Sequence, residues 1–133
     1  MTPDEPPDDM KVLLVDPDRY TATMYRIGLE QSGFEVESVR TASDLFATAG
    51  QGECVIVMEW EHLGLAGPQV LGRLRASDAS RDVPVLVLTN RDGDLKKLTQ
   101  LAAKAGAQGW LVKAHTTPLD LADSVRDLLG KAA

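Results

Sequence analysis

The sequence predicts an α/β fold in which one parallel sheet of five strands is covered on both faces by helices. Two observations predict it. Short apolar, β-branched segments alternate with segments of helical spacing, and three of the apolar segments are nearly continuous, as strands buried on both faces must be. The chain has 133 residues, the length of a single domain. We therefore expect one (βα)5 domain over residues 11–133, preceded by a disordered acidic arm at residues 1–10.

The expected strands share three properties: each is short, mostly apolar and rich in β-branched residues. They are residues 11–15, 34–39, 54–58, 83–89 and 109–112. Five strand–helix units are too few for an eight-fold barrel. The economical arrangement is an open, doubly wound sheet with the flavodoxin-like strand order 2-1-3-4-5.

A helix is expected after each strand. In the first, Tyr20, Met24 and Ile27 lie on one face, and Gly33 ends the helix. Thr41 is suited to cap the second helix at its N-terminus. The remaining helices are expected at residues 43–49, 68–76, 94–106 and 118–130.

Polar residues stand at the C-terminal ends of four of the strands. Asp16, Glu59, Thr89 and Lys113 each end or directly follow an apolar run. In a parallel sheet these ends form one rim, and ligands bind there at the switch point between the first and third strands. Clustered carboxylates repel unless a divalent cation or an ammonium compensates them, and a lysine and a hydroxyl can hold phosphoryl oxygens.

Composition excludes several classes of protein. The net charge is −6, and residues 1–10 hold four of the 20 acids, which leaves 16 acids against 14 bases in the rest. This balance argues against nucleic-acid binding by the domain. Cys54 is the only cysteine, so no intramolecular disulfide is expected. No apolar run approaches the roughly 20 residues of a membrane span, and we expect a cytoplasmic protein that does not bind membranes.

Several segments together resemble the response-regulator receiver domain, the CheY-like family of two-component phosphorelay signalling. They are "KVLLVD" (11–16), the acid at 59, "VPVLVLT" (83–89) and "AGAQGWLVK" (105–113). The resemblance covers residues 11–130. It implies that an acid after the third strand accepts a phosphoryl group from a histidine kinase, that acids after the first strand help to bind Mg²⁺, and that the domain is a signalling module rather than an enzyme.

The resemblance also implies roles for single positions. Glu59 matches the phosphoacceptor, Thr89, Asn90 and Lys113 match positions around the phosphoryl group, and Trp110 matches the aromatic that reorients on activation. The matching metal positions, of which the last contributes its backbone carbonyl, are Asp16, Asp18, Glu59 and Glu61.

The sequence departs from the family pattern at five positions, and four of these changes disfavour switching by phosphorylation. Glu59 is one methylene longer than the usual aspartate, and Pro17 stands where the second metal-binding acid is expected. Asn90 replaces a small residue, Trp110 is bulkier than usual, and Ala114 replaces a proline whose preceding bond is usually cis, so a trans bond is expected here. We therefore expect a pseudo-receiver that acts by protein–protein interaction, needs no cofactor and binds Mg²⁺ weakly at most.

The resemblance also places a partner surface on residues 94–130. The expected members are Lys97, Lys104, Trp110 and Arg126. The partner would be a signalling protein, either a histidine kinase or an output protein, and homodimerisation through the same surface is left open. Two alternatives remain: a conventional Mg²⁺-dependent phosphoacceptor, and a small flavodoxin-like enzyme, which the absence of a glycine from the loop at residues 16–21 disfavours.

Overall fold

The expected sheet is confirmed. The computed structural model describes residues 10–60, 67–90 and 95–132. Within them, five parallel strands are hydrogen-bonded in the order β2-β1-β3-β4-β5. Nearly all of the expected arm at residues 1–10, and the expected metal position Glu61, lie outside the described residues.

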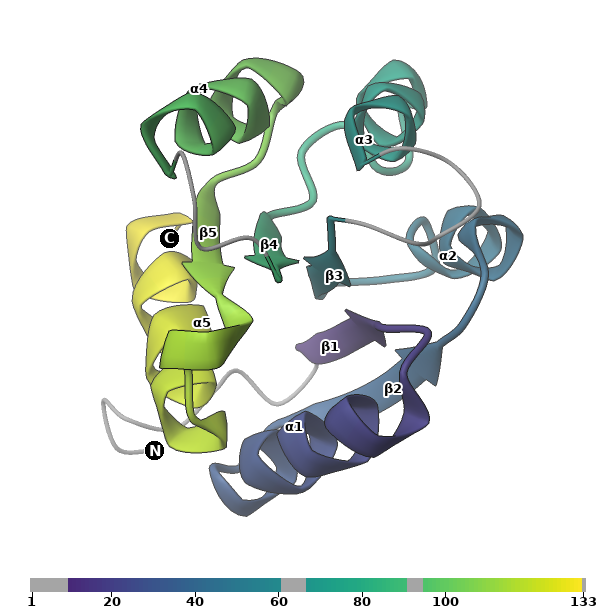
Figure 1. The fold of residues 1–133 in the computed structure, drawn as a ribbon. Helices are drawn as coiled ribbons and strands as arrows, with labels where there is room; N and C mark the ends of the chain where they lie inside the picture. The colour runs from purple at the N-terminus through teal and green to yellow at the C-terminus, as the bar shows by residue number, and fades with distance from the viewer. Residues whose placement is uncertain (1–9, 61–66, 91–94, 133) are drawn as a thin grey trace.

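Strands and helices alternate along the chain (Figure 1). The strands are β1 (Lys11–Val15), β2 (Glu35–Val39), β3 (Cys54–Glu59), β4 (Val85–Thr89) and β5 (Gly109–Val112). The helices are α1 (Arg19–Gln31), α2 (Ala42–Thr48), α3 (Gly67–Ala76), α4 (Leu95–Ala105), α5 (Pro118–Ala132) and a short 3₁₀ helix, η1 (Lys113–His115).

Two hydrophobic cores lie on opposite faces of the sheet. Along β1, Val12 and Leu14 face the core under α1 and α5, whereas Leu13 and Val15 face the core under α2 and α3. Figure 1 shows α1 and α5 on one side of the sheet and α2, α3 and α4 on the other. Successive side chains of a strand point to opposite faces, so the apolar runs are continuous because both faces are covered.

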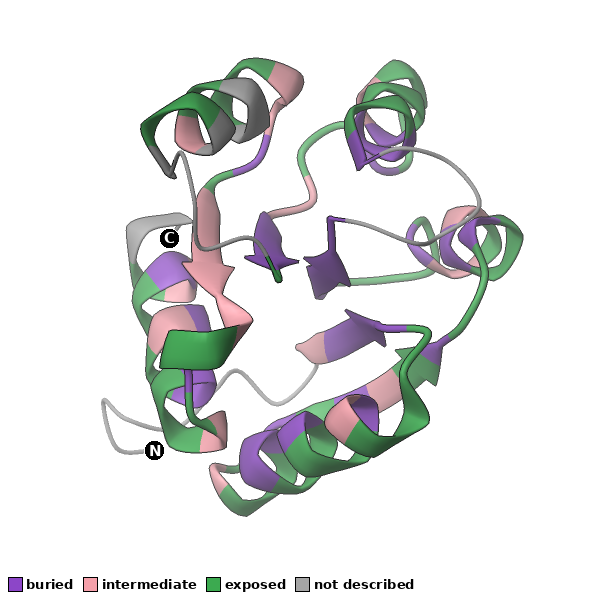
Figure 2. Cartoon of the chain, viewed as in Figure 1, coloured by how far each residue is buried: buried purple, intermediate pink, exposed green. Residues whose placement is uncertain are grey.

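The expected face of α1 is its solvent face. Tyr20 and Ile27 are exposed, whereas Tyr25 and Leu29 are fully buried on the opposite side of the helix. Figure 2 shows this division between an exposed and a buried side of α1. The helix contains two apolar stripes at helical spacing. Packing against the sheet and α5 buries the stripe that contains Tyr25 and Leu29.

Three of the expected helix ends are confirmed and one is wrong. Gly33 and Gly106 end α1 and α4 with φ of 96° and 104°, which glycine adopts without a Cβ clash. Thr41 caps α2, because its Oγ1 accepts a hydrogen bond from Asp44 N at 3.1 Å. Gly130, in contrast, lies inside α5, which continues to Ala132.

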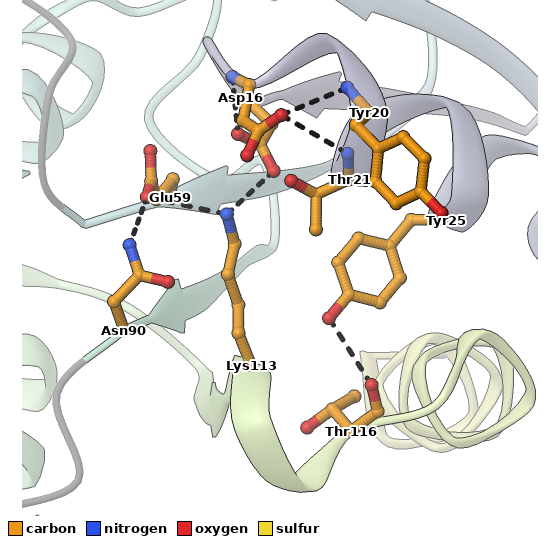
Figure 3. Close-up of polar contacts among 9 residues, drawn as sticks. Asp16, Tyr20, Thr21, Tyr25, Glu59, Asn90, Lys113 and Thr116 are labelled. Carbon is orange, nitrogen blue, oxygen red and sulfur yellow. Dashed lines mark hydrogen bonds and ion pairs between the residues drawn. The ribbon is translucent and has the colours of Figure 1, made fainter.

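The chain after β5 turns through η1 with trans peptide bonds. No described residue has a cis peptide bond, so the trans bond expected between Lys113 and Ala114 is confirmed. The sequence pattern did not predict a helical turn here. This turn begins at Lys113 and carries its side chain over the ends of β1 and β3 (Figure 3).

Candidate functional site

The strand ends form the expected rim. The register pairs Val15 with Met58 and Thr89 with Val112, and Glu59 pairs with Leu88. Asp16, directly after β1, therefore lies beside the last residue of β3, and Lys113 follows the strand next to Thr89. Residues far apart in the sequence are brought together because all the strands run in the same direction.

The centre of the site is the ammonium of Lys113, which lies between two carboxylates (Figure 3). Lys113 Nζ donates to Asp16 Oδ2 at 2.8 Å and to Glu59 Oε1 at 3.4 Å. The side chains of Asp16, Glu59 and Lys113 are 0%, 3% and 9% exposed. One buried positive charge thus compensates two buried carboxylates, which would repel each other without it.

Glu59 accepts hydrogen bonds from two elements through the same oxygen. Its Oε1 accepts from Asn90 Nδ2 at 2.6 Å as well as from Lys113. Its Oε2 is buried and has no hydrogen-bond partner among the described residues. Burial raises the pKa of Glu59, and the positive charge of Lys113 opposes that shift only in part. The site therefore resists a full negative charge on this carboxyl.

Lys113 is held in its charged form. Burial by itself lowers the pKa of Lys113, but the hydrogen bond and charge of Asp16, together with Glu59, outweigh burial and raise it overall. Asp16 makes the shorter contact. The lysine is therefore anchored mainly by Asp16, and Glu59 is its second partner.

Asp18 serves the start of α1. Its Oδ1 accepts from the backbone N–H groups of Tyr20 at 3.0 Å and Thr21 at 3.4 Å, which makes it the N-cap of the helix. Its own N–H donates to Asp16 Oδ1 at 3.0 Å. Asp18 is thus near the site, but its carboxylate is engaged by the helix, a role that the spacing of the sequence did not reveal.

Two residues that the sequence analysis missed position the lysine turn. Tyr25 is 1% exposed and its hydroxyl donates to the backbone carbonyl of Thr116 at 3.3 Å, directly after η1. Gly28 lies so close to Pro118 that a Cβ on it would meet the proline Cβ at 2.3 Å. The close approach of α1 and α5 sets where η1, and hence Lys113, is placed. A glycine within a helix was the available signal.

A tryptophan lies behind the acceptor position. Trp60 is 8% exposed and belongs to the core on the α2 and α3 side. A Cβ on Gly67, the first residue of α3, would meet the Trp60 ring at 2.5 Å. The indole therefore fills the space between the end of β3 and the start of α3.

A cavity of about 570 Å³ opens beside Lys113, Glu59 and Asp18. Its polar lining includes Glu59, Asn90 and Lys113, and its apolar lining includes Met24 and Tyr25. Pro17 and Ala114 also line it. The cavity is large enough for a small anion, but the residue at 17 contributes no carboxylate to it.

The other expected site residues lie in several environments. Thr89 is buried at the end of β4, and Trp110 on β5 is partly buried against the core on the α2 and α3 side. Lys97 and Lys104 are exposed on α4. Arg126 lies apart from them: its guanidinium packs over Phe34 and donates to the backbone carbonyl of Ser32, on the α1 side of α5. Its place on the expected partner surface stays a prediction.

The described residues contain neither a metal-binding cluster nor a membrane-spanning helix. No group of three or more His, Cys, Asp or Glu side chains among them is arranged to hold a metal ion. In the same part of the chain, no helix has the length and apolar character needed to cross a membrane.

Comparison with known proteins points to one family. The model described as the response regulator receiver domain matches residues 12–126. The chemotaxis protein CheY homolog of Campylobacter jejuni is 28% identical over 125 residues, which cover 91% of this chain and 93% of the relative. The phosphate regulon transcriptional regulatory protein PhoB of Rhizobium meliloti is 25% identical over 123 residues, 92% of this chain. This chain spans 53% of the length of that PhoB.

The fold comparison agrees. The structure of the chemotaxis response regulator CheY4 of Vibrio cholerae superposes with a TM-score of 0.78 at 27% identity. The match covers 90% of this chain and 98% of CheY4. A CheY-like receiver domain protein from Methanospirillum hungatei has a TM-score of 0.80 at 19% identity, which is a likeness of fold.

Proposed function

The chain belongs to the response regulator receiver domain family, and on that premise we propose that it is a pseudo-receiver whose output does not depend on phosphorylation. The family consists of two-component signalling modules. The proposal concerns how this member signals: by binding another protein in a conformation that it holds without a phosphoryl group.

The observation that carries the proposal is the environment of Glu59. Its Oε1 receives donors from both Asn90 and Lys113. Its other oxygen, Oε2, makes no hydrogen bond among the described residues but is buried, which shields it from a phosphodonor. The extra methylene also moves the carboxyl by about a bond length, and a misplacement of about 1 Å can slow a transfer reaction by roughly 10²-fold. Glu59 is therefore a poor phosphoacceptor.

The residues around the site also fit Mg²⁺ poorly. Pro17 has no carboxylate, and Asp18 caps α1. The remaining pair, Asp16 and Glu59, already shares the Lys113 ammonium. Mg²⁺ requires a near-ideal octahedral set of oxygen ligands at about 2.1 Å. We propose that the domain needs no cofactor and binds Mg²⁺ weakly at most.

The partner surface that we propose is formed by α4, β5 and the adjacent side of α5. Lys97 and Lys104 are exposed on α4, and Trp110 is partly exposed on β5. A partly exposed tryptophan beside cationic side chains is suited to the centre of an interface. PhoB is by name a transcriptional regulatory protein and is about twice as long as the part matched here. The partner would be an output protein of this kind or a histidine kinase.

A direct test is phosphorylation by a small phosphodonor. After incubation with acetyl phosphate and Mg²⁺, intact-protein mass spectrometry should find no added mass on this chain. The CheY homolog of C. jejuni, treated in parallel, is the positive control. An acid-labile adduct of about 80 Da, the mass of a phosphoryl group, that disappears in Glu59→Gln would show a conventional acceptor and overturn the proposal.

A second measurement tests whether the site still binds a phosphoryl analogue, which phosphoryl transfer to Glu59 alone does not show. Trp60 directly follows Glu59 and is buried beside it. In a Trp110→Phe variant, Trp60 is the only tryptophan, and its fluorescence can be followed while Mg²⁺ and beryllium fluoride are added. We expect no saturable change. A saturable response would show that a phosphoryl analogue still binds beside Glu59, which favours the conventional switch.

A further inference from the structure

The solvent face of α1 carries an apolar stripe. Tyr20, Met24 and Ile27 are 83%, 39% and 51% exposed, and we call these three residues the α1 stripe. Among the described residues, Leu119 is the only other exposed large hydrophobic side chain. The spacing i, i+4, i+7 aligns the three side chains along one face of the helix. Aligned apolar side chains in water indicate a surface that contacts another protein.

A hollow runs beside this stripe. Its volume is about 560 Å³, and it is lined by Arg19, Tyr20, Thr23, Met24 and Ile27. All five residues belong to α1, so whatever fills the hollow must lie along this helix. The Tyr20 ring projects from the same face and has the size to fill a hollow of this kind on another molecule.

We propose that a second copy of this chain packs on the α1 stripe, with the two α1 helices antiparallel across a two-fold axis. With the axis beside Thr23 and Met24, Tyr20 of each copy lies opposite Ile27 of the other, within the hollow. A two-fold interface uses the same patch on both copies, so each contact occurs twice. Aromatic side chains seated in a hollow are the usual anchors of such interfaces.

Charge complementarity selects a second copy in this orientation. Arg19 is exposed at the N-terminal end of the stripe, and Glu30 stands at the C-terminal end with its side chain 48% exposed. Antiparallel pairing brings Arg19 of each copy beside Glu30 of the other. Glu30 already accepts from Arg26 at 2.6 Å on its own helix and would then lie between two arginines.

The size of the patch predicts a weak dimer. Stable interfaces bury about 800 Å² on each partner, more than three apolar side chains and their charged neighbours provide. We expect a dissociation constant of the order of 10–100 μM, which corresponds to a free energy of dissociation of about 5–7 kcal/mol. Figure 1 shows α1 and α4 on opposite faces of the sheet. Dimerisation through α1 therefore leaves the surface proposed for the signalling partner accessible.

The test is a charge exchange followed by sedimentation velocity over a range of protein concentrations. The wild type should dimerise, and Arg19→Glu and Glu30→Arg should each weaken the dimer at least tenfold, since each places like charges at both ends. An equimolar mixture of the two variants should form a heterodimer at least as stable as the wild-type dimer. All these residues are exposed, and circular dichroism checks that the fold is retained.

Disulfide formation tests the geometry separately. Thr23→Cys lies beside the proposed axis and should form a symmetric disulfide dimer under mild oxidation, whereas Ala103→Cys on α4 should not. Cys54 is buried and does not interfere. The proposal is overturned if the wild type remains monomeric to millimolar concentration, if the mixed charge variants do not associate, or if Ala103→Cys crosslinks in preference to Thr23→Cys. A monomer would leave the stripe to a partner of another kind.

Discussion

Lys113 is bound more closely by Asp16 than by Glu59. The Nζ–Oδ2 distance to Asp16 is 2.8 Å, against 3.4 Å from Nζ to Oε1 of Glu59. The acid after β1 therefore anchors the lysine, and the acid at the acceptor position shares it with Asn90. Because the two ion pairs differ in length, substitutions of Lys113 and of Glu59 should have different effects on the stability of the protein.

Replacing Lys113 should be the most damaging single change at the site. Lys113→Met leaves the carboxylates of Asp16 and Glu59 buried without their cation, and breaking a buried ion pair costs about 3–5 kcal/mol. Because folding raises the pKa of Lys113, its stabilising contribution is complete below the ordinary value of 10.5 and is lost as the pH rises through the folded-state pKa. Urea denaturation should show a large penalty at pH 7 that shrinks above about pH 10.5.

The matched control for Lys113→Met removes a surface cation. Lys104→Met on α4 changes the same residue type at an exposed position and should alter the free energy of unfolding by less than about 0.5 kcal/mol. Equal effects of the two substitutions would show that the buried bridge contributes nothing beyond a surface charge.

Glu59→Gln should become relatively more stable as the pH rises. The pKa of Glu59 is raised above 4.5 by burial, so the folded protein keeps this proton to higher pH than the unfolded chain does. The contribution of Glu59 to stability is therefore best below about pH 4.5 and declines as the pH rises through the folded-state pKa. The variant cannot lose a proton there, so the difference in the free energy of unfolding should move in its favour as the pH rises.

The measurement for Glu59→Gln is the difference in the free energy of unfolding between the variant and the wild type at each pH. Guanidinium denaturation from pH 4 to pH 8 gives both free energies of unfolding, and the other carboxyls cancel in the difference. A difference that is constant over this range, or that moves in favour of the wild type as the pH rises, would contradict the raised pKa.

Two substitutions together should restore metal binding. Pro17→Asp returns a carboxylate to the rim, and Glu59→Asp shortens the acid at the acceptor position. The double variant should bind Mg²⁺ at least tenfold more tightly than the wild type. The new carboxylate at position 17 and the shortened carboxylate at position 59 can then both supply an oxygen to one octahedral ion. Isothermal titration calorimetry measures this, and each single variant serves as a control. Unchanged affinity in the double variant would mean that Pro17 and Glu59 do not limit Mg²⁺ binding.

Gly67→Ala should destabilise the region behind Glu59. The new Cβ would meet the Trp60 ring at 2.5 Å, and overpacking of this kind costs about 1–3 kcal/mol. Gly72→Ala is the control, because no atom lies within 4 Å of its Cβ position in the same helix. That change should stabilise α3 by about 0.5–1 kcal/mol. In the Trp110→Phe background, where Trp60 is the only tryptophan, the midpoints of thermal unfolding followed by fluorescence should therefore move in opposite directions.

The element types and the order of the sheet were predictable from local sequence. Continuous apolar runs require strands covered on both faces, and the alternation with helical spacing requires parallel strands. The site followed from the same pattern, because parallel strands place Asp16, Glu59 and Lys113 at one rim. These predictions succeeded because they depend on the period of the sequence and on the direction of the chain.

Other features depended on packing between distant segments. α1 has two apolar stripes of similar spacing, and only its contact with the sheet and α5 shows that Tyr25 is buried and Tyr20 is exposed. Arg126 was expected on the partner surface, and packing adds contacts that spacing did not predict: its guanidinium lies over Phe34 and donates to the carbonyl of Ser32. Spacing establishes which residues share a face of a helix, and it contains no information on where that face points.

The sequence by itself determined the fold, the family and the residues that meet at the rim. The tertiary structure alone decided how those residues share their charges. Lys113 lies nearer to Asp16 than to Glu59 because η1 begins at Lys113, and Tyr25 and the close contact of Gly28 with Pro118 hold the chain that follows it. The difference between the two ion-pair distances, 2.8 Å and 3.4 Å, depends on contacts of α1 with η1 and α5, which are far from α1 in the sequence.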